Sequence, residues 1–107
     1  MIMTLTKQEF NVLLMLYAAS IDGNIRKEEV EEILEQASPE SYRKVKKSFS
    51  QMSDMEVLDL INENKSQFIT NEAEKQQVLD QLRAVVSVDN SVSPIENYLL
   101  QTLNRIL

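Results

Sequence analysis

Four carboxylates stand at matching places in a short pattern that occurs twice in the chain. Asp22 is followed seven positions later by Glu29, and Asp89 is followed at the same interval by Glu96. In each copy the Asp follows the apolar end of a predicted helix, and the Glu falls in the first turn of the next one. Carboxylate oxygens are the ligands that Ca²⁺ and Mg²⁺ prefer, and carboxylates crowded together without a cation repel one another. If the two copies fold against each other, the four side chains could form one divalent-cation site.

The residues between each Asp and its Glu favour the same backbone path in both copies. Gly23 is the only glycine of the chain, and it stands where an ending helix needs a residue that tolerates positive φ. Asn90, the next-best residue for that conformation, holds the matching place. A single β-branched residue follows in each copy, Ile25 and Val92. We therefore expect two related helix–loop–helix units, at about residues 10–37 and 71–107.

Composition excludes several other kinds of chemistry. The 107 residues include no Cys and no His, which excludes disulfides, zinc sites with thiolate or imidazole ligands, and triads that need a histidine base. No nucleophile with its base can be recognised, so we expect no enzymatic activity. The net charge of −6 disfavours nucleic acid and anionic membranes. The apolar run from Val12 to Ala19 is too short to span a membrane and follows Glu9, unlike a leader, so we expect a cytoplasmic protein.

The same composition favours an all-α fold. One glycine and two prolines are too few for the tight turns of a β-sandwich or barrel, whereas Leu, Glu, Lys, Gln and Ala favour helix. Capping boxes and Ser-Pro pairs mark four helix starts. We expect one compact bundle of about six helices over residues 1–107, at 6–21, 26–37, 38–49, 53–62, 71–88 and 93–107. Residues 64–70 are expected to form a loop or one helical turn, with Phe68 and Ile69 buried.

Hydrophobic patterning predicts which side chains form the core. The first helix is apolar nearly all round, which is typical of a helix covered on several sides, and we expect it to form the centre together with the long fifth helix. On the second helix the apolar positions predict an inward face. Its members are Val30, Ile33, Leu34 and Ala37. Met15, Met52 and Met55 are also expected in or near the core.

The doubled acidic loops, at this spacing in a chain of this kind, resemble the tellurite-resistance TerB-like family. That family typically shows Ala-Asp-Gly, a short loop and a Glu on the next helix, twice, and the resemblance covers approximately residues 10–107. It implies a compact helical domain with pseudo-twofold halves, an acidic centre that binds a divalent cation, and a role in a stress-associated assembly. Carried over residue by residue, the ligands are Asp22, Glu29, Asp89 and Glu96.

This chain departs from the family pattern at four positions. Ile21 and Val88 replace the usual small residue before each Asp, and Asn90 replaces the second Gly. Arg26 stands where a small hydroxyl residue is common, and it brings a positive charge near Asp22.

Two readings of the acidic loops remain open. In the first, the chain is a non-enzymatic module that binds Ca²⁺ or Mg²⁺ or serves as a docking platform for a protein partner. In the second, it is a plain helical interaction domain in which Glu29 and Glu96 cap their helices and the Asp residues bond their own loops. An EF-hand is excluded because the Gly and Glu fall at loop positions two and eight instead of six and twelve.

Overall fold

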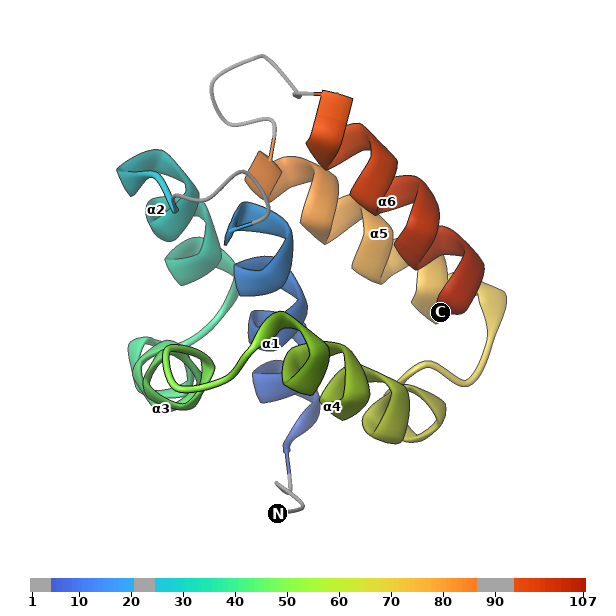
Figure 1. The fold of residues 1–107 in the computed structure, drawn as a ribbon, viewed down its shortest axis with the longest axis horizontal. Coiled ribbons are helices and arrows are strands. Elements are labelled where there is room, and N and C mark those ends of the chain that lie inside the picture. The colour runs from blue at the N-terminus through green and yellow to red at the C-terminus, as the bar shows by residue number, and fades with distance from the viewer. Residues whose placement is uncertain (1–4, 21–24, 87–93) are drawn as a thin grey trace.

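The computed structural model describes residues 5–20, 25–86 and 94–107, with the side chains of 94–96 and 106 outside the description. This part of the chain contains helices and no strand (Figure 1). The helices are α1 (Lys7–Ser20), α2 (Lys27–Gln36), α3 (Pro39–Phe49), α4 (Asp54–Phe68), α5 (Glu72–Val86) and α6 (Pro94–Ile106). The predicted all-α fold with about six helices is confirmed. None of the described helices is long and apolar enough to cross a lipid bilayer.

The predicted capping signals begin the helices where expected. At the start of α1, Thr6 Oγ1 accepts a hydrogen bond from the Glu9 N–H at 3.1 Å, and Glu9 Oε1 accepts one from the Thr6 N–H at 2.8 Å. Ser53 and Glu56 form the same reciprocal pair before α4. Ser38 caps α3, which has Pro39 at its first position. The fourth predicted signal, at Ser93, lies outside the described residues.

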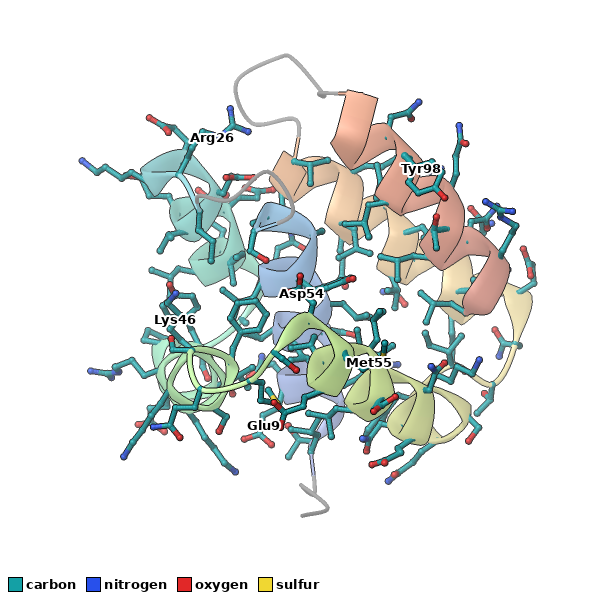
Figure 2. The ribbon with its side chains drawn as sticks, viewed as in Figure 1. Glu9, Arg26, Lys46, Asp54, Met55 and Tyr98 are labelled. Atoms are coloured by element: carbon teal, nitrogen blue, oxygen red, sulfur yellow. The ribbon has the colours of Figure 1, made fainter. Side chains whose placement is uncertain are left out.

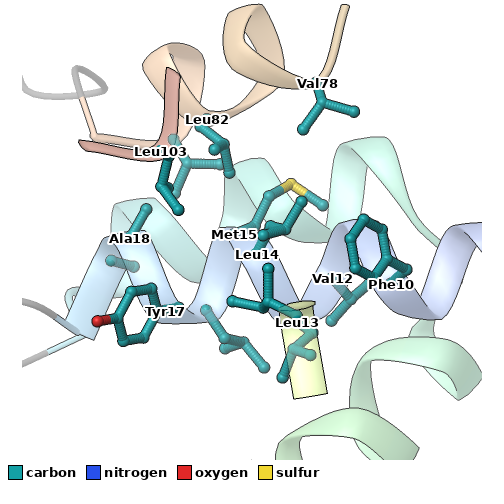
Figure 3. Close-up of a cluster of buried hydrophobic side chains, with 14 of the residues drawn as sticks. Phe10, Val12, Leu13, Leu14, Met15, Tyr17, Ala18, Val78, Leu82 and Leu103 are labelled. Carbon is teal, nitrogen blue, oxygen red and sulfur yellow. The ribbon is translucent and has the colours of Figure 1, made fainter. Parts of the chain in front are cut away.

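The first helix forms the centre of the molecule, as predicted. Every side chain from Val12 to Ala19 is buried, and α1 packs against each of the other five helices. Figure 3 shows its side chains meeting Val78 and Leu82 of α5 and Leu103 of α6. A helix that is apolar on all sides must be covered on all sides, and here the covering comes from both halves of the chain.

The fifth helix is only partly central. It packs against α1, α2 and α6 through one buried face, formed by Val78, Leu79, Leu82, Val85 and Val86. Its opposite side exposes polar residues, including Asp80 and Arg83. The helix is therefore amphipathic and covers one side of α1, and at 15 residues it is no longer than α4.

The prediction that the fourth helix ends near Asn62 is wrong, because α4 continues to Phe68. Asn64 is buried and its side-chain amide donates to the Leu60 carbonyl at 2.8 Å, so it satisfies its own polar group inside the helix. The Phe68 ring packs on Phe10, with ring centroids 5.3 Å apart. This aromatic contact lies at the end of α4, and Phe68 and Ile69 are half-buried against the core rather than fully buried.

Two predicted core positions are exposed. Leu34 is 37% exposed, although Ile33 and Ala37 are buried as expected. Met55 is 66% exposed because it lies in the first turn of α4, where Val57, two residues later, turns to the core instead. Met15 is buried, as predicted.

The helices that flank the two acidic segments share one end of the molecule. In Figure 1, α1 and α5 finish in the upper half of the view, and α2 and α6 begin there. We call this side, defined by Ser20, Arg26, Val86 and Pro94, the acidic end. Both predicted helix–loop–helix units thus have their helix ends on the same side, while residues 21–24 and 87–93 lie outside the description.

Candidate cation site

Of the four predicted ligands, Glu29 is the one whose side chain the structure describes. It lies in the first turn of α2 and is completely buried. Its Oε1 accepts a hydrogen bond from the Arg26 backbone N–H at 2.9 Å and another from Arg26 Nε at 3.2 Å. Its Oε2 is also buried and has no hydrogen-bond partner among the described residues.

A buried carboxylate oxygen without a partner is unusual in a folded protein. Burying an ionised group is costly unless it is paired, hydrogen-bonded or coordinated to a metal. Arg26 donates hydrogen bonds to Oε1 of Glu29, and Oε2 has no partner among the described residues. A carboxylate oxygen is a hard ligand of the kind that Ca²⁺ and Mg²⁺ bind. The donor chemistry at Glu29 therefore fits a divalent cation.

The local sequence explains why Glu29 turns inward at the start of α2. It stands three positions after Arg26, the residue that caps the helix, and from there its carboxylate can reach back to the free N–H of the cap. The positive end of the helix dipole lies at the same place and favours a negative charge. Ile33, one turn further along, is buried, so the inner face of α2 carries Glu29 into the interior.

The structure places Glu96 in the matching position of the second unit, as far as the backbone is described. It lies in the first turn of α6, which begins at the acidic end. Its side chain, and the whole of Asp22 and Asp89, lie outside the described residues. Within the described part of the chain, no three His, Cys, Asp or Glu side chains gather closely enough to hold a metal ion. The convergence of all four carboxylates stays a prediction.

Further acidic groups lie along α2. Glu32 has a pKa above its ordinary value, first because it is partly buried and then because Glu35 lies beside it with a like charge. Gln36 donates a hydrogen bond to Glu32 Oε1 at 3.3 Å, which acts in the opposite direction. Glu28, Glu31 and Glu35 are exposed and form a solvated face of the helix.

Sequence reasoning missed two charge contacts. It placed Arg26 near Asp22 and did not pair it with Glu29, although the three-residue spacing at a helix start was a usable signal. It also did not pair Lys44 with Glu9. Lys44 Nζ lies 2.9 Å from Glu9 Oε2, and nothing in the sequence marks a pair 35 positions apart. In Figure 2, Glu9 and Arg26 lie at opposite ends of the molecule, so the two contacts are independent.

Comparison with known proteins agrees with the all-α fold. No curated protein and no solved structure matched the chain. The family model described as "Tellurite resistance protein TerB" matches residues 9–107, which is nearly the whole chain. The protein therefore belongs to the TerB family.

Proposed function

We propose that this TerB-family protein is a non-enzymatic module that binds a divalent cation, Ca²⁺ or Mg²⁺, at its acidic end. Glu29 is the buried ligand in this proposal. Asp22, Asp89 and Glu96 supply further carboxylate oxygens from the two acidic segments. The proposal also includes a docking role toward a protein partner in a stress-associated cytoplasmic assembly.

The observation that carries the proposal is that Glu29 Oε2 has no hydrogen-bond partner among the described residues. The side chain has 0% exposure, so water cannot solvate this oxygen as it solvates a surface glutamate. A cation held there would supply the missing partner and would draw in the other carboxylates. The shared location of the four helix ends supports the same idea, because it brings the starts of α2 and α6 to one side of the core.

The alternative is a helical interaction domain whose acidic residues act as caps. One observation favours it: Glu29 Oε1 accepts from the Arg26 N–H at 2.9 Å, which is the contact of a helix-capping glutamate. Capping accounts for Oε1 and for the position of Glu29 in the chain. It does not account for Oε2, which is why we favour the cation.

Isothermal titration calorimetry with Ca²⁺, Mg²⁺, Mn²⁺ and Zn²⁺ tests the proposal. We expect saturable binding of Ca²⁺ or Mg²⁺ by the wild-type protein. Glu29→Gln, and separately Asp22→Asn combined with Asp89→Asn, should weaken it at least about tenfold, because each removes ligand charge from the site. Asp59→Asn combined with Glu63→Gln is the matched control, since it removes two exposed charges from α4.

The result that supports the cation proposal is loss of binding in the acidic-end variants with unchanged binding in the α4 control. Equal weakening in both would indicate diffuse attraction to a protein of net charge −6. No saturable binding by the wild type, with circular dichroism showing a folded helical protein, would favour the capping alternative.

A further inference from the structure

Arg26 is an unusual residue for the position it holds. It is the N-cap of α2, a place where Ser, Thr, Asp and Asn are favoured because their side chains accept a hydrogen bond from the helix. A guanidinium cannot accept one. Its positive charge also lies at the positive end of the helix dipole, where a cation is disfavoured. Both local effects act against an arginine here.

The other described helix starts in this chain follow the usual rule. Thr6, Ser38 and Ser53 precede α1, α3 and α4, and each uses its hydroxyl to accept a backbone N–H of its helix. Thr6 and Ser53 are each paired with a Glu three positions later, as Arg26 is paired with Glu29. The start of α2 is thus a capping box in which the hydroxyl residue has been replaced by a cation.

The buried carboxylate of Glu29 offsets these local penalties. Glu9 and Glu56, the equivalent residues of α1 and α4, differ from it: Glu56 is exposed, and Glu9 has Lys44 from another helix as its counter-charge. The described ion pair of Glu29 is with Arg26, and the Arg26 side chain is only 32% exposed. Arg26 therefore reaches from the surface toward a carboxylate that is sealed from water.

We infer that Arg26 is a built-in counter-ion that neutralises Glu29 when no cation is present and competes with a divalent cation for this carboxylate. The inference rests on the proposed cation site and names how that site is regulated. A divalent ion carries twice the charge of the guanidinium. It can therefore displace the Arg26 side chain from Glu29, whereas a monovalent ion cannot. The site would then fill only when the divalent cation is abundant, and filling it would release Arg26 toward solvent.

Removing the arginine charge tests this inference directly. Arg26→Gln keeps a long polar side chain without the charge, and we expect the dissociation constant for Ca²⁺ or Mg²⁺ to fall about tenfold or more. Arg26→Lys retains a positive charge and should stay within about threefold of the wild type. Arg105→Gln is the matched control, because it removes the same charge from the exposed far end of α6 and should leave the constant unchanged.

The possible outcomes separate the inference from the proposed function. If the wild type binds the cation and Arg26→Gln binds it more tightly, both the inference and the proposed function are supported. If only Arg26→Gln binds it, the inference is supported and cation binding by the wild type is contradicted. Equal or weaker binding by Arg26→Gln, beside a wild type that binds, overturns the inference and leaves the cation site standing. If neither protein binds a cation, both are overturned.

A stability measurement provides a readout that does not depend on cation affinity. In the presence of EDTA, Arg26→Gln should lower the midpoint of urea unfolding, because Glu29 loses its counter-charge. The same substitution in a Glu29→Gln background should have little effect, since no buried charge remains to be neutralised. An equal loss in the two backgrounds would show that Arg26 does not neutralise Glu29, and would overturn the inference.

Discussion

Lys44 of α3 places its ammonium 2.9 Å from the buried carboxylate of Glu9, and this contact ties α3 to the start of the central helix. Burial raises the pKa of Glu9. The Thr6 N–H, the charge and hydrogen bond of Lys44 and the Thr6 hydroxyl together outweigh that effect, so the pKa lies below its ordinary value. One carboxylate thus serves both as a helix cap and as half of a link between helices.

The Glu9 contact should make the protein sensitive to acid. Because the pKa of Glu9 is lower in the folded state, its contribution is fully present above the ordinary glutamate pKa and is lost as the pH falls through the folded value. Glu9→Gln should cost about 1–3 kcal/mol at about pH 7 and less at about pH 3. Urea unfolding followed by circular dichroism at both pH values measures this. Glu63→Gln, on the exposed side of α4, is the control; a pH-independent cost of Glu9→Gln would contradict the assignment.

Two methionines provide a matched test of the core. Met15 is 1% exposed on α1 and Met55 is 66% exposed on α4. Met15→Ala should lower the free energy of unfolding by about 2–5 kcal/mol, because it removes buried methylene groups and leaves a cavity. Met55→Ala should change it by less than about 0.5 kcal/mol. Chemical denaturation of both variants gives the comparison, and similar losses at the two positions would contradict the packing described for α4.

The folded protein should be more stable when Glu32, on the acidic face of α2, is neutral. Its pKa is raised in the folded state, first by burial and then by Glu35. The stability it contributes is therefore present below the ordinary glutamate pKa and lost as the pH rises through the folded value. Glu32→Gln should raise the free energy of unfolding at about pH 7 by up to about 1 kcal/mol and change it little at about pH 4. Thermal unfolding at both values measures it; destabilisation at pH 7 would mean that the hydrogen bond from Gln36 outweighs the repulsion.

Local signals predicted where helices begin better than where they end. Thr6, Ser38 and Ser53 each act through atoms within three or four residues, so their effect can be read from the sequence. The end of α4 has no glycine or proline, and Ile69 there has an extended backbone, with φ −123°. What lies at that end is the contact of Phe68 with Phe10, 58 positions away, and spacing along one helix does not reveal such a contact.

The candidate cation site could be predicted only in part, because only some of its contacts are local in sequence. The position of Glu29 at a helix start follows from its spacing, and so does its bond to the Arg26 N–H. Its complete burial depends on how α2 packs on α1 and α5, which the pattern of α2 alone does not fix. Leu34 shows the same limit, because a helical stripe identifies the apolar face but not how far each edge of that face is covered.

The most direct test of the central claim is to follow the backbone amides of Glu29 and Glu96 by NMR in one sample while Ca²⁺ or Mg²⁺ is added. If the two acidic segments share one cation, both amides should shift with the same saturable dependence on cation concentration, and Glu29→Gln should abolish the shift at Glu96. Independent shifts at the two amides, or no saturable shift at either, would contradict the claim.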